Sequence, residues 1–291
     1  MRHAPPGLRP RDAPELWLTA ALLGASAALF ALLAAMGWPG ATHSCVASAS
    51  CYCEAAGPGP IRQSTNTWSG LGWAIAGLWI AWDAARRRRS ADQPLNRMTS
   101  TRFYPGHYAL VVAFLAPGAM FYHASLTEWG GKLDIVSMYL FIDYWILYNV
   151  TRLYDLSRRT FLGVYATATA LLLIPRVVLG SIDAGIAIFA GLICVAVLSE
   201  IAIALPARVR WLGPRQRLDV RRGWLWASIA LFLVARAAED HLPCDPAAWF
   251  QRHGVLHLVQ AVSNCATWLY FAAGELGSEA PLPVRARLRP L

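Results

Sequence analysis

The chain has 291 residues, 56% of them hydrophobic and only 15% charged, and its formal net charge is +9. Such a composition excludes an ordinary soluble globular domain. A nucleic-acid partner is not expected either, because the arginines lie mostly in short segments between apolar runs, where they act as topology signals and lipid-headgroup contacts. The composition predicts an all-α polytopic membrane helix bundle.

Residues 1–14 are polar, basic and rich in proline, and we expect a disordered tail. The apolar run 15–38 is too long for the core of a signal peptide, so we predict an uncleaved first transmembrane helix. The segment 39–65 is a loop rich in Gly, Pro, Ser and Cys. Further membrane spans are predicted at about 66–85, 104–123, 133–150, 161–178, 184–205, 224–238 and 248–273. A second basic tail closes the chain at 276–291.

Arginine placement predicts the orientation of these spans. The arginine-rich segments are the N-terminal tail, 86–102, 152–159, 208–222 and the C-terminal tail, and they alternate along the chain with segments that hold one Lys or Arg or none. Both termini are therefore expected on the cytoplasmic side. Four cysteines fall in the outer segments, where an oxidising compartment would favour disulfides: Cys45, Cys51, Cys53 and Cys244.

The outer boundary also collects residues with metal-binding chemistry. His253 and His257 are four residues apart, so on a helix both rings lie on one face. The predicted topology places His123 and Asp134 at the same depth. Three histidines and a water form an open, catalytic type of zinc site, in which Asp134 would orient that water or carry its proton. A single histidine at a membrane boundary is usually a hydrogen-bonded structural residue, but the shared depth of all four groups favours a metal site.

Two neighbouring groups of residues have simpler interpretations. Glu239, Asp240 and His241 are expected to be solvated in the loop that follows the seventh span. Trp73 is expected in the apolar core or in the aromatic belt at the membrane interface.

Several motifs together resemble the alkaline ceramidase family, part of a superfamily of seven-helix membrane hydrolases that includes adiponectin-receptor-like and GPI-lipid-remodelling proteins. The resemblance covers about residues 51–273 and depends on the order and spacing of Cys53-Glu54, Asn66-Thr67-Trp68-Ser69, Phe121-Tyr122-His123, Asp134 and His253-x-x-x-His257. It implies a seven-helix zinc hydrolase core over 39–275, to which the span 15–38 is an addition.

The resemblance also implies roles for single residues. It implies Zn²⁺ on His123, His253 and His257, with Asp134 acting on the metal-bound water. It implies a Cys53–Cys244 disulfide and makes Asn66 and Ser69 supporting polar residues. The implied reaction is hydrolysis of the amide of a ceramide-like membrane lipid, toward the outer leaflet, and no obligatory protein partner is inferred.

The chain departs from the family pattern at two places. Ala119 stands four residues before His123, where the family carries a serine, so a hydroxyl that could hold the zinc water or help to stabilise the oxyanion is missing. The family's ceramidases also bind Ca²⁺ through several carboxylates. Here Glu54 remains as a possible calcium ligand, but Cys51 and Gln63 stand where acids are expected, so we predict weak Ca²⁺ binding or none.

Two alternatives to hydrolysis stay open. The first is a non-catalytic receptor or lipid-binding membrane protein with a structural zinc site, which Ala119 favours. The second is a transporter, against which the two halves of the chain show no repeat and no matching pair of broken helices.

Overall fold

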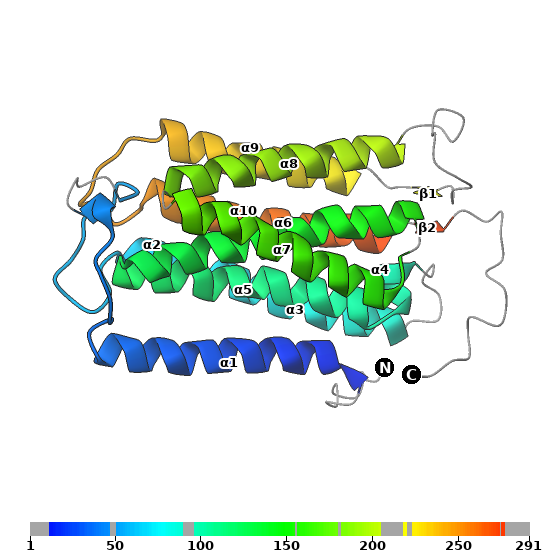
Figure 1. The fold of residues 1–291 in the computed structure, drawn as a ribbon, viewed down its shortest axis with the longest axis horizontal. Helices are drawn as coiled ribbons and strands as arrows, with labels where there is room; N and C mark the ends of the chain where they lie inside the picture. The colour runs from blue at the N-terminus through cyan, green and yellow to red at the C-terminus, as the bar shows by residue number, and fades with distance from the viewer. Residues whose placement is uncertain are drawn as a thin grey trace, which may run out of the picture.

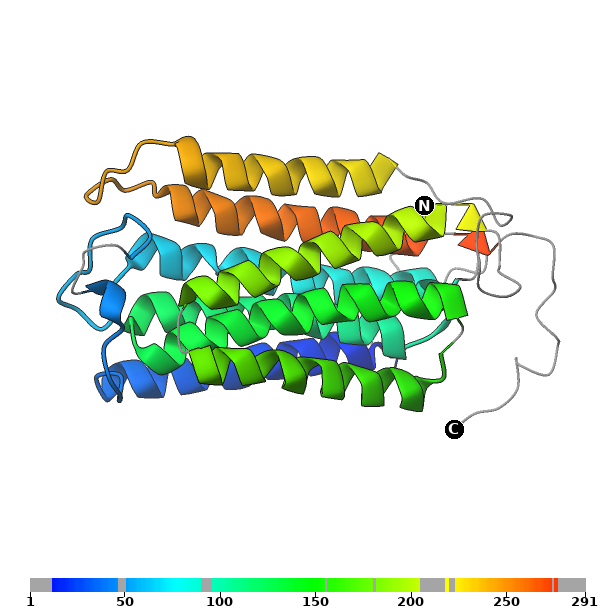
Figure 2. The same ribbon diagram turned by 45° about the horizontal axis from the view of Figure 1, so that its top comes forward.

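The computed structural model describes residues 12–46, 51–89, 96–154, 156–179, 182–204, 218–219, 223–273 and 275–276. These residues form a bundle of α-helices that run side by side (Figures 1 and 2). The helices are α1 (Pro14–Ala35), α2 (Ser64–Ser69), α3 (Leu71–Arg89), α4 (Arg97–Ser100), α5 (Phe103–Ser125), α6 (Glu128–Tyr154), α7 (Arg158–Leu179), α8 (Ile182–Ala204), α9 (Gly223–His241) and α10 (Arg252–Ala273). A single 3-10 turn, η2 (Ser44–Val46), precedes α2. Strands β1 (Leu218–Asp219) and β2 (Glu275–Leu276) form a minimal antiparallel pairing.

The long helices coincide approximately with the predicted spans, and the all-α fold is confirmed. Among the described residues, four helices are long and apolar enough to cross a membrane: Pro14–Ala35, Phe103–Ser125, Glu128–Tyr154 and Gly185–Ile203. The second predicted span differs in detail, because α2 ends at Ser69 and α3 begins at Leu71. A Cβ on the intervening Gly70 would lie 2.9 Å from Cγ of Met120 on α5, so the break occurs where the chain passes close to that helix. Most of the predicted tails at 1–14 and 276–291 lies outside the described residues.

The outer surface of the bundle is apolar. Only 6% of the most apolar stretch of α1 is buried. Large hydrophobic side chains are also exposed on four different helices, for example Leu32, Leu171, Leu198 and Leu233. Many exposed large hydrophobic side chains are unfavourable in water, whereas lipid would cover them. The surface therefore agrees with the predicted membrane location.

Helix α5 forms the centre of the bundle and packs against α1, α2, α3 and α6. Glycine permits the closest of these approaches. A Cβ on Gly77 of α3 would lie 2.6 Å from the Cβ of Ala113 on α5, and a Cβ on Gly118 of α5 would lie 2.4 Å from Oγ of Ser137 on α6. Small residues that let helix backbones approach closely are the usual means of helix association in membranes. They bring α5, which carries His123, and α6, which carries Asp134, close together.

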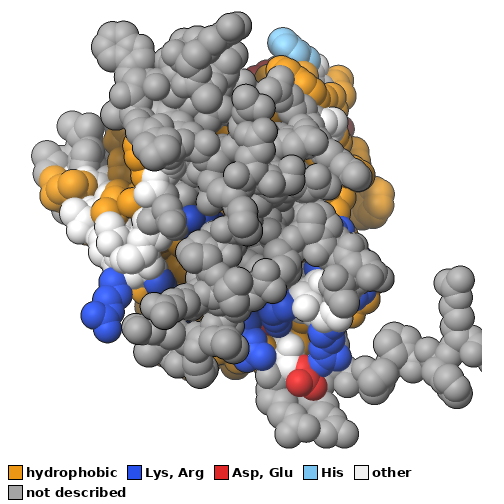
Figure 3. Space-filling model, turned by 90° about the vertical axis from the view of Figure 1, so that its right-hand side faces the viewer, with side chains coloured by type: hydrophobic (Ala, Val, Ile, Leu, Met, Phe, Trp, Pro, Cys, Tyr) orange, Lys and Arg blue, Asp and Glu red, His pale blue; other side chains and the backbone are white. Residues whose placement is uncertain are grey.

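The two ends of the bundle differ in chemistry. The arginine end contains the four arginines that close α3, together with Arg152 and Arg158, and Figure 3 shows Lys and Arg side chains around its described surface. There Arg88 pairs with the buried Glu15 at 2.5 Å and so fastens α1 to α3. The opposite end, at the left of Figure 1, contains the segment after α1 and the connection between α9 and α10. We call it the cysteine end, because Cys45, Cys51, Cys53 and Cys244 lie there.

Candidate metal centre

Three histidines from two helices meet near the cysteine end. His123 lies in the last turns of α5, and His253 and His257 lie in the first turns of α10. One ring nitrogen of each histidine lies within 4.8 Å of the others, and the Nε2 atoms of His123 and His253 are 3.2 Å apart. All three side chains are buried, with exposed fractions of 0%, 8% and 3% in chain order. The predicted convergence of the three imidazoles is therefore confirmed.

Local structure fixes where each helix presents its histidine. Helix α5 ends two residues after His123, and Leu126 follows in the left-handed conformation (φ 49°), its N–H donating to the carbonyl of Tyr122. Before α10, the buried side chain of Gln251 donates to the carbonyls of Asp245 and Ala248 and so ties the preceding loop to the start of the helix. The four-residue spacing then places His253 and His257 one turn apart.

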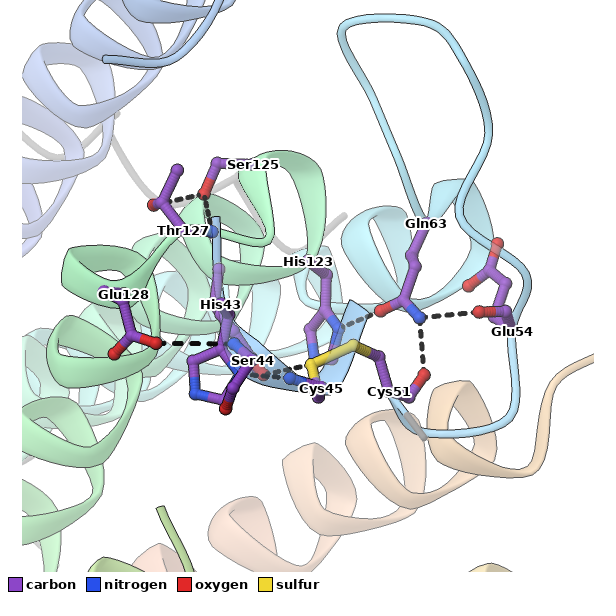
Figure 4. Close-up of a disulfide and its surroundings, with 11 residues drawn as sticks. His43, Ser44, Cys45, Cys51, Glu54, Gln63, His123, Ser125, Thr127 and Glu128 are labelled. Carbon is purple, nitrogen blue, oxygen red and sulfur yellow. Dashed lines mark hydrogen bonds between the residues drawn. A yellow bond between two sulfur atoms is a disulfide. The ribbon is translucent and has the colours of Figure 1, made fainter. Parts of the chain in front are cut away.

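Gln63 determines which nitrogen of His123 is free. Its side-chain NH₂ donates to the carbonyls of Cys51 at 2.6 Å and Glu54 at 2.7 Å (Figure 4). Because the NH₂ group faces two acceptors, Oε1 of Gln63 is the atom that contacts Nδ1 of His123, at 2.8 Å. Nδ1 of His123 therefore carries the proton, and the lone pair of Nε2 faces the cluster.

Ser69 has the same effect on His257. The hydroxyl of Ser69 donates to the backbone carbonyl of Asn66 at 2.9 Å, so its oxygen accepts from Nδ1–H of His257, also at 2.9 Å. Ser69, which the sequence predicted as a supporting polar residue, thus contacts His257 directly. Asn66 is fully buried, and its side-chain amide has no hydrogen-bond partner among the described residues. Buried polar groups without partners are rare and often face a ligand or water.

The remaining histidine, His253, faces a carboxylate. Its Nδ1 lies 3.2 Å from Oε2 of Glu239, near the end of α9, and both side chains are largely buried, with exposed fractions of 10% and 12%. The expectation of a solvated Glu239 is wrong, because α9 continues to His241 and keeps Glu239 on the helix face that meets α10. Asp240, by contrast, pairs with Arg236 at the surface.

Two disulfides hold a loop segment over the histidines. One joins Cys53 to Cys244, the pair that the family resemblance implies, and the other joins Cys45 to Cys51 (Figure 4). Between them, Tyr52 has a positive φ of 53°, which is unusual for a residue with a side chain. The ring of Tyr52 stacks on His253 at 4.1 Å between centroids and contacts His123 at 5.3 Å. Tyr52 therefore covers one side of the cluster.

Glu54 has a structural role in the same segment. Its two carboxylate oxygens accept from the backbone N–H groups of Thr65 and Asn66, each at 2.8 Å. These are free N–H groups in the first turn of α2, where a carboxylate is also favoured by the helix dipole. The expectation of weak calcium binding or none at Glu54 stays a prediction.

One pair of the cluster, His123 and His253, has the nitrogen separation of zinc ligands. Tetrahedral Zn²⁺ with Zn–N bonds of about 2.0–2.1 Å requires ligand nitrogens about 3.3 Å apart. The 3.2 Å between the Nε2 atoms of His123 and His253 agrees with this separation. A neutral His253 carries one N–H. If the proton is on Nδ1, the lone pairs of Nε2 of His253 and Nε2 of His123 face each other. If it is on Nε2, the lone pair of Nδ1 faces the carboxylate of Glu239. A cation among the three rings removes this conflict.

Asp134 lines a cavity and is not part of the three-histidine group. The cavity is lined by Trp73, Leu115, Asp134, Met138, Phe141, Phe189, Phe232, Gln260, Ser263 and Asn264. Trp73 connects it to the cluster, because its ring lies 4.7 Å from that of His257. Most of the wall is apolar, and Asp134 contributes its only carboxylate. Ala119 is buried on α5, one turn before His123.

Comparison with known protein families finds no matching family model, and comparison with curated proteins finds no matching protein. The described residues thus define an all-α protein with candidate membrane helices and a buried three-histidine cluster that could bind a metal. The three histidines and Ser69 were predicted as site residues. Tyr52, the contact of Gln63 with His123, and Glu239 were not predicted, although an acid close to the eighth span was a usable signal for Glu239.

Proposed function

We propose that this protein is a zinc-dependent integral-membrane hydrolase that cleaves the amide bond of ceramide-like lipids. The three-histidine cluster carries the proposal, because it presents inward lone pairs in a helical bundle whose outer surface is apolar. The cavity that Trp73 joins to the cluster supports it, since a mostly apolar wall with a few polar side chains, one of them a carboxylate, suits an amphiphilic substrate. The arrangement of arginines supports termini on the cytoplasmic side and a site toward the outer leaflet.

In the proposed reaction, His123, His253 and His257 would hold the metal, which would supply an activated water and a Lewis acid for the carbonyl. Gln63 and Ser69 keep two of these rings in the tautomer that presents Nε2. Hydrolysis adds the water oxygen to the carbonyl carbon and breaks the C–N bond. Asp134 accepts the proton of that water and returns it to the leaving nitrogen, which departs as an amine. Tyr52 limits access of bulk water from the cysteine end.

A test combines metal analysis with turnover. Protein purified in detergent should contain about one Zn²⁺ per chain and should release fatty acid from labelled ceramide faster than from an ester lipid of equal chain length. His257→Ala should lose both zinc and turnover. His241→Ala, which removes an exposed histidine outside the cluster, should retain both. Absence of zinc in the wild-type protein would refute the proposal.

Ala119 favours a second candidate function, a receptor or lipid-binding protein in which the zinc site is structural. One turn before His123 on α5, Ala119 presents a methyl group where the alkaline ceramidase family carries a hydroxyl. This candidate predicts zinc binding and lipid binding without turnover of amide or ester lipids, so the same measurements separate the two functions.

A further inference from the structure

The three histidines of the cluster have different partners on their outer side. Nδ1 of His123 contacts a neutral amide oxygen, and Nδ1 of His257 contacts a neutral hydroxyl. Only His253 faces an ionisable acid, Glu239, with 3.2 Å between Nδ1 and Oε2. Gln63 and Ser69 stand at the two ends of α2, whereas Glu239 lies on α9, so the outer partner of His253 comes from a different helix than the other two.

Glu239 and His253 lack other partners at the atoms that face each other. Oε2 of Glu239 and Nδ1 of His253 are buried, and neither has a hydrogen-bond partner among the described residues, because their own contact falls short of hydrogen-bond geometry. No described cation pairs with Glu239, since the nearby Arg236 pairs with Asp240 at 2.6 Å. Because these two buried atoms are close and have no other partner, we expect Nδ1–H of His253 to donate to Oε2 of Glu239 once a cation on Nε2 fixes the ring.

We propose that Glu239 is a positioning residue for the metal centre, accepting Nδ1–H of His253 and supplying a negative charge beside the bound cation. A carboxylate behind a metal-ligating histidine fixes the tautomer, orients the ring and strengthens the ligand. Two neutral outer partners leave the charge of a divalent cation uncompensated in an apolar bundle, and Glu239 offsets part of it. This inference rests on the proposed metal site and extends it to the outer side of His253.

The structure also explains how a residue of α9 reaches this position. Among the described residues, helices α9 and α10 form the most extensive helix pair, and the Cys53–Cys244 disulfide anchors the loop between them. Glu239 therefore reaches His253 from α9, whereas the partners of His123 and His257 come from α2. Its neighbour Asp240 points to the surface, and the two acids of one helix turn provide a matched pair for mutation.

The test measures zinc affinity by competition with a chelator and the visible spectrum of the Co²⁺-substituted protein. Glu239→Ala should weaken zinc binding about 10- to 100-fold. Glu239→Gln, which keeps an acceptor oxygen and removes the charge, should weaken binding less and shift the Co²⁺ bands. Asp240→Asn should leave both unchanged. If Glu239→Ala does not fold, the near-isosteric Glu239→Gln decides the question.

The outcomes separate this inference from the proposed function. The role of Glu239 would be overturned if folded Glu239→Gln kept the wild-type zinc affinity and Co²⁺ spectrum and Glu239→Ala kept the wild-type zinc affinity. That result would leave the metal site standing. Failure of the wild-type protein to bind Zn²⁺ or Co²⁺ would overturn both.

Discussion

Gln63 joins the loop at the cysteine end to a metal ligand, so replacing it by methionine tests both connections at once. Methionine has nearly the same length and shape but cannot make the three hydrogen bonds of the amide. Gln63→Met leaves the carbonyls of Cys51 and Glu54 and the Nδ1–H of His123 without their present partners.

The magnitude follows from the burial of these groups. Each unsatisfied buried polar group costs about 1–3 kcal/mol, so three would cost roughly 3–9 kcal/mol if all stayed dry. The segment 51–54 is partly exposed and can admit water to its two carbonyls, whereas His123 is fully buried. We therefore expect a loss of about 3–4 kcal/mol in the free energy of unfolding, at the lower end of that range. Zinc affinity should fall by about 10- to 100-fold, because His123 loses the acceptor that fixes its tautomer.

Gln251 offers a matched control. Its side chain is equally buried and donates to two backbone carbonyls at 3.0 and 2.7 Å, but it makes no contact with a histidine of the cluster. Gln251→Met should therefore lower the melting temperature and weaken zinc binding less than Gln63→Met does, because Gln251 orders the loop before α10 without bonding to a histidine ring. The assays are thermal melting in detergent and zinc competition at a fixed pH. Equal zinc affinities for Gln63→Met and Gln251→Met would refute the assigned role of Gln63.

Three further changes test other parts of the structure. Ala119→Ser places a hydroxyl one turn before His123. We expect the rate of fatty-acid release from ceramide to rise by about 10²-fold. An unchanged rate would show that the missing hydroxyl does not limit turnover. Gly77→Ala forces a Cβ to within 2.6 Å of Ala113 and should cost about 1–3 kcal/mol by denaturation, whereas Gly191→Ala, with nothing within 4 Å, should cost little. The double variant Cys53→Ser with Cys244→Ser releases the loop that holds Tyr52 over the cluster. Its zinc Kd should rise about tenfold. An unaltered Kd would show that this disulfide does not support the metal site.

The convergence of the histidines could be predicted because spans of similar length end at shared depths. Arginine placement predicts the direction of each span, and the predicted directions place the end of the His123 helix and the start of the His253 helix at one side. The four-residue spacing then supplied His257. No knowledge of side-chain packing was needed for these three residues, because the membrane restricts where helix ends can lie.

The outer partners of the cluster could not be predicted in the same way. The contact of Gln63 with His123 depends on the path of a loop that bends twice with positive φ at Tyr52 and Cys53, and helix periodicity contains no information about that path. Glu239 was assigned to a loop because three polar residues in sequence suggest a helix end. The helix continues through all three, and whether a terminal acid faces its neighbour or the solvent depends on how α9 packs on α10.

The number of available ligands bears on whether a zinc ion here is catalytic or structural. Structural sites usually use four protein ligands, most often cysteines, whereas catalytic sites use three and leave one position open. Cys45, Cys51 and Cys53 lie in the segment that covers the cluster, but each is oxidised in a disulfide and is not a free thiolate ligand. Among the described residues, the metal-ligand group contains three histidines, and Asp134 lies outside it. This chemistry supports an open site, and a Co²⁺ spectrum unchanged in Asp134→Asn would show that the carboxylate does not fill the fourth position.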